Sequence, residues 1–175
     1  MKNISIQFLA LTLLVLLTGF QSQAQISKVD IIATGLTCSM CSNAINKQLQ
    51  SLAEVERIGT DLNTNTFTVF FKDGQAVEPK VLKNAVEKAG FFVGSMVLTA
   101  DFKEAKIEDN AQVLLNGATY VFIDTKSKSA DAANQFRVLD KGFVTQKEYK
   151  KLIKSYSKYP TYAAEKEEDY HLKAI

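Results

Sequence analysis

Residues 35–41 read Gly-Leu-Thr-Cys-Ser-Met-Cys, and the patterns on either side of this stretch decide the fold of the first half of the chain. Before the stretch, Val29 and Ile31 alternate with polar residues, which indicates a strand. After it, Ile45 and Leu49 recur at helical spacing, with polar residues on the other faces. We therefore expect a loop that leads from a strand into the first turn of an amphipathic helix.

The residues up to about 98 continue this alternation of strand and helix patterns. Two strands meet at the polar turn 63–65, a second helix begins near Pro79 and stops at Gly90, and Phe92 starts a last strand. The apolar strand residues are Val55, Ile58, Leu62, Phe67, Val69 and Phe71, and those of the second helix are Val81, Leu82, Ala85, Val86 and Ala89. An antiparallel sheet with both helices on one face buries all of these stripes. Residues 28–98 are therefore predicted to form an α+β domain of strand, helix, strand, strand, helix and strand.

Residues 99–175 are predicted to form a second, small β-rich unit with a C-terminal helix. Short strands are expected at 102–107, 112–115, 119–123 and 135–139, with Asn116-Gly117 as a hairpin turn. The core of this unit is expected to hold Phe102, Tyr120, Phe122, Phe136 and Phe143. No motif in this part of the chain indicates a function.

The helix of this second unit is predicted from a capping box. Thr145 is followed three residues later by Glu148, and an apolar stripe then ends before Pro160. The lysine series on this helix is Lys147, Lys150, Lys151 and Lys154, which we interpret as its solvated face, although an anionic partner could use it. The charged residues 163–169 are expected to be a solvated end of the chain.

The first 24 residues have the pattern of an export signal. Lys2 precedes an apolar run at 4–17, and small residues at 22 and 24 predict cleavage between Ala24 and Gln25. A membrane span is the weaker interpretation, because the run is shorter than the roughly 20 apolar residues that a bilayer requires. We therefore expect a periplasmic or secreted protein whose mature chain has no membrane span.

The charge and cysteine content of the chain argue against a nucleic-acid partner and against a disulfide-stabilised fold. The chain has 175 residues, a formal net charge of +2, and basic and acidic residues scattered along it, so nucleic acid is not expected as a partner. Its two cysteines both lie in one short motif, which leaves no disulfide framework across the fold.

Cys38 and Cys41 are the candidate metal ligands. Two cysteines three residues apart, with the second at a helix start, can turn both sulfurs toward one point. The unpaired N–H groups of the helix start favour the thiolate, and thiolates select soft ions such as Cu(I), Ag(I) and Hg(II). Two donors are too few for a closed tetrahedral zinc centre, although Zn(II) can still bind thiolates. The site is therefore open and suited to passing its metal onward.

With these residues in place, the chain resembles the heavy-metal-associated domain family over residues 28–98. That family includes copper chaperones, N-terminal domains of copper-transporting ATPases and periplasmic mercury-binding proteins. Its signature G-M-T-C-x-x-C with an apolar residue four positions later is matched here by residues 35–41 and Ile45, with Leu36 in place of the usual Met, a swap that conserves volume. The resemblance implies a ferredoxin-like βαββαβ sandwich, metal binding by Cys38 and Cys41, and Phe91 packed close to the metal loop. It also implies a metal-transporting ATPase or another metal-accepting protein as partner.

The leading hypothesis is an exported Cu(I) metallochaperone or scavenger that is not an enzyme. A mercury-binding member of the same family and a thiol–disulfide oxidoreductase are the alternatives. Met40 is interpreted as an exposed loop tip, Met96 as a core strand residue and His171 as a solvent-facing residue, none of them as a metal ligand.

Overall fold

The computed structural model describes residues 25–36, 39–102, 107–125, 135–164 and 166–175. The expected export signal at 1–24 lies outside the described residues, and so do Thr37 and Cys38 of the motif. In the first half, the elements are β1 (Gln25–Thr34), α2 (Ser39–Gln50), β2 (Val55–Asp61), β3 (Thr66–Phe71), α3 (Pro79–Lys88) and β4 (Phe92–Asp101). Their order is the one that the sequence predicts.

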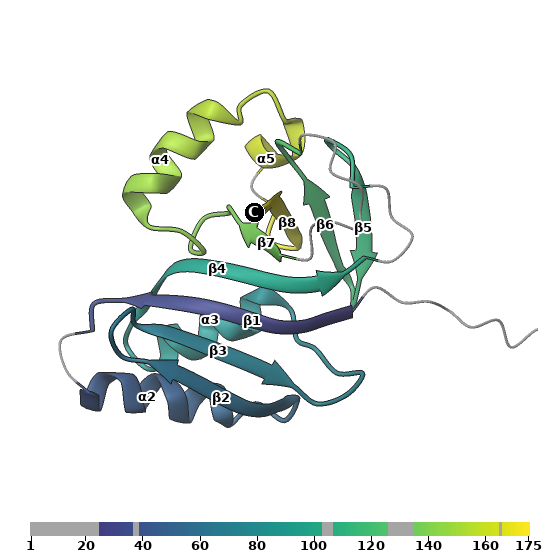
Figure 1. The fold of residues 1–175 in the computed structure, drawn as a ribbon. Helices are drawn as coiled ribbons and strands as arrows, with labels where there is room; N and C mark the ends of the chain where they lie inside the picture. The colour runs from purple at the N-terminus through teal and green to yellow at the C-terminus, as the bar shows by residue number, and fades with distance from the viewer. Residues whose placement is uncertain (1–24, 37–38, 103–106, 126–134, 165) are drawn as a thin grey trace, which may run out of the picture.

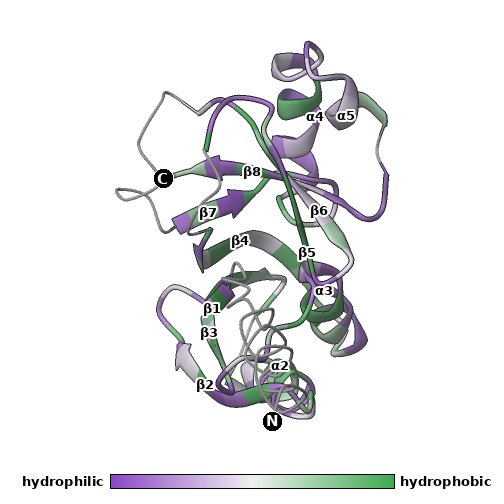
Figure 2. Ribbon diagram, turned by 90° about the vertical axis from the view of Figure 1, so that its right-hand side faces the viewer, coloured by the Kyte–Doolittle hydropathy of each residue, from purple (hydrophilic) through white to green (hydrophobic). Residues whose placement is uncertain are grey.

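The four strands of the first half lie side by side in the order β2-β3-β1-β4, and each neighbouring pair is antiparallel. Figures 1 and 2 show α2 and α3 on the same side of these strands. Strand β3 explains this arrangement, because Phe67, Val69 and Phe71 are buried while the residues between them are partly exposed. One face of the strands therefore carries the apolar side chains that the two helices cover, as in a ferredoxin-like sandwich.

Leu62 corrects one detail of the sequence prediction. It was expected to belong to the apolar set of the second strand, but β2 ends at Asp61 and the Leu62 side chain is 56% exposed. The carboxylate of Asp61 accepts hydrogen bonds from the Asn63 backbone N–H and the Thr64 hydroxyl, each at 2.9 Å. These bonds start the hairpin turn one residue early and turn Leu62 to solvent.

The second half of the chain extends the same sheet. Its elements are β5 (Gln112–Leu115), β6 (Ala118–Phe122), β7 (Gln135–Val138), α4 (Gln146–Ser155), α5 (Pro160–Ala164) and β8 (Asp169–Ala174). Strand β7 pairs antiparallel with β4, which makes one sheet of eight strands in the order β2-β3-β1-β4-β7-β8-β6-β5. The division into a domain at 28–98 and a unit at 99–175 stays a prediction.

Three of the four strands predicted for this half coincide with β5, β6 and β7 to within one residue. Asn116 and Gly117 form the turn between β5 and β6 with φ values of 53° and 85°, as a type I′ turn requires. Most of the strand predicted at 102–107 lies outside the described residues, and its two described ends, Phe102 and Ile107, are not in a strand. The preceding strand β4 continues to Asp101 and pairs with β1 and β7.

The end of the chain differs most from the prediction. The predicted cap is present, because Thr145 is the N-cap of α4 and its hydroxyl accepts a hydrogen bond from the Glu148 backbone N–H at 3.3 Å. However, the chain does not end in this helix, because α5 and then β8 follow it, and β8 lies between β7 and β6. His171 in β8 is 1% exposed, so its interpretation as a solvent-facing residue was wrong.

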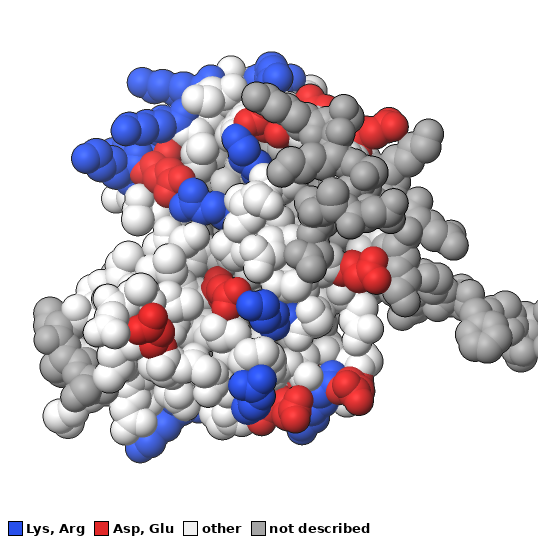
Figure 3. All heavy atoms as spheres, viewed as in Figure 1, with Lys and Arg blue, Asp and Glu red and all other residues white. Residues whose placement is uncertain are grey.

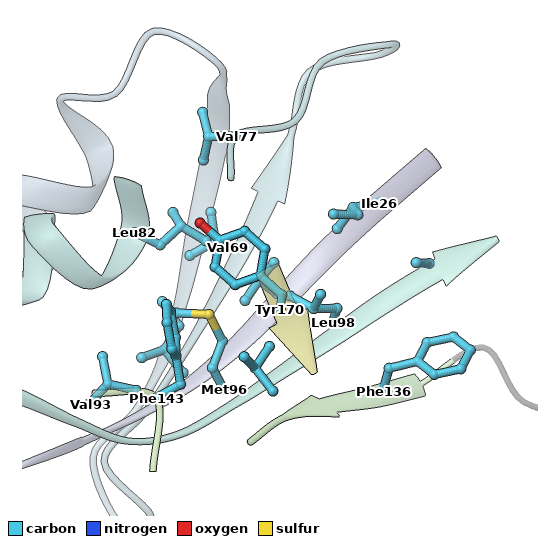
Figure 4. Packing of buried hydrophobic residues seen from close by; sticks show 14 of the residues in the cluster. Ile26, Val69, Val77, Leu82, Val93, Met96, Leu98, Phe136, Phe143 and Tyr170 are labelled. Carbon is cyan, nitrogen blue, oxygen red and sulfur yellow. The ribbon is translucent and has the colours of Figure 1, made fainter. Parts of the chain in front are cut away.

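A single large apolar cluster runs through both halves of the sheet. As predicted, it includes Met96 and the aromatic side chains Phe102, Tyr120, Phe122, Phe136 and Phe143. Figure 4 shows Tyr170 of β8 among residues of the first half, such as Met96 and Leu98. Its hydroxyl also donates to Glu78, the N-cap of α3, at 3.3 Å. The two halves therefore share one core.

A second cluster packs α4 and α5 onto the opposite face of strands β6, β7 and β8. It contains Val121, Ile123, Leu139, Tyr156, Tyr159 and Tyr162. None of the helices in the described parts of the chain has the length and apolar content needed to span a membrane.

Candidate metal centre

The loop that carries the cysteine motif starts at a left-handed residue. Strand β1 ends at Thr34, and Gly35 follows with φ of +88°. A side chain rarely adopts this conformation, which is the physical reason for glycine at the first position of the motif. Leu36 is partly buried and packs against the main core, so it anchors the start of the loop.

Cys41 lies in the first turn of α2, where its side chain is half-buried. The inward face of this helix is formed by Ser42, Ile45 and Leu49, which are buried at helical spacing. Because Cys41 precedes Ile45 by one turn, it sits at the rim of this face, near the start of the helix. The position combines partial shelter with access from solvent, as a metal ligand that exchanges its ion requires. Cys38 lies outside the described residues.

The ring of Phe91 lies beside the start of the loop. A Cβ built on Gly35 would be 3.9 Å from Cδ1 of Phe91, and Phe91 is packed against the main core. This contact fits the expectation that Phe91 packs close to the metal loop. The next residue, Phe92, is 68% exposed, so the two rings differ sharply in environment.

The N-terminus of α2 carries the partial positive charge of the helix dipole. Its first turn contains no acidic residue, and its only basic residue at the ends, Lys47, lies in the last turn. No carboxylate in the first turn of α2 offsets the partial positive charge of the helix start, which favours a thiolate there.

Met40 is the other soft donor next to Cys41 among the described residues. Met40 is 81% exposed next to Cys41, as expected for a loop tip. Within the described parts of the chain, no three or more His, Cys, Asp or Glu side chains come together as a metal site. Cys38 and Cys41 as metal ligands stay a prediction from the sequence.

Sequence reasoning missed two polar pairs in the second half. Nδ1 of His171 lies 2.7 Å from Oδ1 of Asp140, and Arg137 makes two parallel hydrogen bonds of 2.7 and 2.8 Å to Glu148. Both pairs join residues from different elements. No local spacing signals such contacts, because they arise only when β7, β8 and α4 pack together.

Comparison with known protein families identifies the first half of the chain. Residues 30–92 match the model of the heavy-metal-associated domain. These residues are a heavy-metal-associated domain. The match includes Gly35, both cysteines and the Phe91-Phe92 pair, and it lies within the range 28–98 expected from the motif.

Solved structures similar to this heavy-metal-associated domain include metal-transport proteins. The yeast copper transporter domain Ccc2a is 34% identical, with 37% of this chain and 88% of that chain covered and a TM-score of 0.34. The N-terminal domain of a potential copper-translocating P-type ATPase from Bacillus subtilis is 30% identical, covering 38% and 82%, with a TM-score of 0.34. Oxidized MerP from Ralstonia metallidurans CH34 is 24% identical, covering 41% and 94%, with a TM-score of 0.35. No curated protein matches the chain significantly.

Proposed function

We propose that this protein binds Cu(I) through the thiolates of Cys38 and Cys41 and passes the ion to another thiol or thioether site. The observation that carries the proposal is the position of Cys41 in the first turn of α2, directly after the Gly35 loop of the heavy-metal-associated domain. Cys38 precedes Cys41 by three residues, so both sulfurs belong to the same short segment.

The chemistry of the donors favours a soft monovalent ion. Thiolates bind Cu(I) strongly, and two of them satisfy the low coordination number that this ion accepts. A site with two protein ligands leaves room for an incoming sulfur from an acceptor. The metal can then move by exchange of one ligand at a time, without a free ion in solution, so the chain acts as a carrier.

We also propose that residues 1–24 are an export signal that is cleaved before Gln25. Their apolar run and the small residues at 22 and 24 support this. The carrier would then work in the periplasm or outside the cell. Its partner would be a metal-transporting ATPase or another metal-accepting protein with accessible sulfur ligands. N-terminal sequencing of the exported protein tests the cleavage, and a mature chain starting elsewhere than Gln25 contradicts it.

A Cu(I) titration under reducing, oxygen-free conditions tests the metal site. In competition with the chelator bicinchoninate, the wild-type chain is expected to withdraw one Cu(I) per molecule. The double change Cys38→Ser, Cys41→Ser is expected to abolish this uptake without unfolding the protein. Met40→Leu serves as the matched control, because it removes an adjacent but exposed sulfur and is expected to leave uptake unchanged.

The same titration separates the alternatives. Displacement of Cu(I) by Ag(I) or Hg(II) is expected at any two-thiolate site, whereas displacement by Zn(II) at equal concentration contradicts a two-thiolate soft-metal site. If the wild type withdraws no Cu(I), or if the double serine variant still does, the proposal is wrong. Rapid turnover of disulfide substrates by the reduced chain would instead support an oxidoreductase.

A further inference from the structure

A groove of about 620 Å³ begins next to the end of β1. Its lining includes Thr34 and Phe92 from the heavy-metal-associated domain, Val144 from the segment before α4, and Tyr149 and Ile153 from α4. Thr34 and Phe92 are paired across β1 and β4, and the Thr34 hydroxyl donates to the Phe92 carbonyl oxygen at 3.3 Å. Since Gly35 follows Thr34 directly, one wall of the groove is continuous with the loop that leads to Cys41.

The opposite wall, α4, is held firmly against the sheet. A Cβ built on Gly94 would be 2.5 Å from Cγ2 of Thr34 and 3.8 Å from Cγ2 of Thr145. The absence of a side chain at Gly94 therefore makes room for Thr34 of β1, while Thr145, the N-cap of α4, lies at ordinary contact distance from the same point. Arg137 of β7 adds the two hydrogen bonds to Glu148 in the first turn of α4. The groove thus has two walls of defined position.

The outer surface of α4 and its flanking residues is strongly basic. Between 141 and 158 the chain carries six exposed lysines, and its one acidic residue there, Glu148, is paired with Arg137. The lysines are Lys141, Lys147, Lys150, Lys151, Lys154 and Lys158. Figure 3 shows Lys and Arg side chains gathered over α4. The one carboxylate in the groove lining, Glu87 of α3, lies 3.9 Å from Lys83.

We propose that this groove and the lysine face of α4 form one docking surface for a partner protein whose contact surface is acidic. The inference rests on the proposed function, because the partner is the protein that exchanges metal with the cysteine motif. Carboxylates around the partner's sulfur ligands would be attracted by the lysines, which speeds encounter and selects orientation. Phe92, 68% exposed beside the loop, would supply the apolar contact at the centre.

A protein partner fits this surface better than an anionic membrane does. Tyr149, Leu152 and Ile153 of α4 pack against the second cluster, and Tyr149 and Ile153 also line the recessed groove. The helix therefore has no protruding apolar stripe for insertion into lipid. An indented groove with charges along its border matches a protruding protein segment more closely than a flat bilayer.

Two synthetic peptides test the proposal. Both carry a Cys-x-x-Cys pair as Cu(I) acceptor, and one has six flanking glutamates where the other has six glutamines. At low ionic strength, Cu(I) transfer from the wild-type chain to the acidic peptide is expected to be about tenfold faster than to the neutral peptide. Added salt is expected to remove the difference. Equal rates for the two peptides at low salt would overturn the proposal.

Matched charge reversals locate the effect. Lys147, Lys150 and Lys154 share one face of α4, and their joint change to Glu is expected to abolish the preference for the acidic peptide. The control changes Lys47, Lys72 and Lys166, which are exposed elsewhere, to Glu and is expected to keep most of the preference. Equal losses in the two variants would contradict a specific surface. Phe92→Ser is expected to slow transfer to both peptides severalfold, with unaltered Cu(I) affinity.

A metal-free experiment separates this proposal from the proposed function. Versions of the peptides with serine in place of cysteine are titrated into the labelled apo protein and followed by NMR. The acidic version is expected to shift amide signals of α4, Val144 and Phe92, whether or not the chain binds Cu(I). Shifts scattered over the surface would overturn the docking site. So would cosedimentation with anionic phosphatidylglycerol vesicles in the absence of any response to the acidic peptide.

Discussion

Nδ1 of His171 lies 2.7 Å from Oδ1 of Asp140, while the backbone N–H of His171 donates to the other carboxylate oxygen at 2.6 Å. Asp140 follows β7 and His171 lies in the middle of β8, so one carboxylate joins two strands. Burial raises the pKa of the Asp140 carboxyl, and the hydrogen bonds and charge of His171 oppose that rise. The Tyr162 ring packs edge-on against the imidazole, with 5.0 Å between the ring centroids, so His171 is buried while the Asp140 side chain keeps 19% of its exposure.

Removal of Asp140 is expected to destabilise the fold. In Asp140→Ala, two buried donors of His171 lose their acceptor, which costs about 2–3 kcal/mol of unfolding free energy. Urea unfolding of this variant, of His171→Ala and of the double variant measures the coupling. The loss of unfolding free energy in the double variant is expected to be much smaller than the sum of the losses in the two single variants. Strict additivity would mean that the two side chains do not stabilise one another.

The Arg137–Glu148 pair is expected to stabilise the attachment of α4. Glu148→Gln keeps the backbone N–H that caps the helix but loses the charged two-point contact, which should lower the free energy of unfolding by about 1 kcal/mol. Glu87→Gln is the control, since Glu87 and Lys83 are 3.9 Å apart at partly exposed positions of α3 and should contribute less than about 0.5 kcal/mol. Chemical denaturation measures the loss in each of the two variants, and equal losses would argue against a special role for the Arg137 contact.

A side chain at position 94 is expected to destabilise the fold, because the methyl group of Thr34 occupies the space that the side chain would need. In Gly94→Ala, the new Cβ would lie 2.5 Å from Cγ2 of Thr34, a clash that should cost about 1–3 kcal/mol. Thr34→Ser removes that methyl group and retains the hydroxyl, so the double variant is expected to recover much of the loss. Thermal unfolding of the two single variants and the double variant tests this. Failure of Thr34→Ser to rescue would place the strain in the backbone.

The Asp124 carboxylate is expected to make the free energy of unfolding decrease at low pH. Hydrogen bonds from Lys173 and Tyr156 hold the pKa of Asp124 below its ordinary value of 3.8. Because the folded state holds the proton less tightly than the unfolded state, this contribution is present above pH 3.8 and is lost as the pH falls through the folded-state pKa. The Asp124 side chain is partly exposed, so Asp124→Asn should cost less than about 1 kcal/mol at pH 7.

Unfolding measured at pH 7 and near pH 3 checks the direction of this effect. The difference between wild type and Asp124→Asn is expected to shrink in acid. Asp73→Asn, in an exposed turn, is the control and is expected to differ little from wild type at either pH. A difference that grows as the pH falls would contradict the ion pair with Lys173.

The first half of the fold was predictable because its signals are local. Gly35 marks a left-handed turn, and Phe67 and Val69 alternate as a strand with one buried face requires. The second half was only partly predictable. Its hairpin at Asn116 follows from turn chemistry, whereas the strand at Asp169–Ala174 sits in a charged stretch whose local pattern favours a solvated end.

For the candidate site, too, some features were predictable from the sequence and others were not. Spacing alone pointed to the cysteine motif and to its place at the start of a helix, since helical periodicity and a glycine turn are properties of neighbouring residues. The groove beside Phe92, the attachment of α4 through Arg137 and Glu148, and the burial of His171 came only with the tertiary structure. They depend on which distant strands pair, and that choice is made by the total burial of many side chains at once, which no short window of sequence contains.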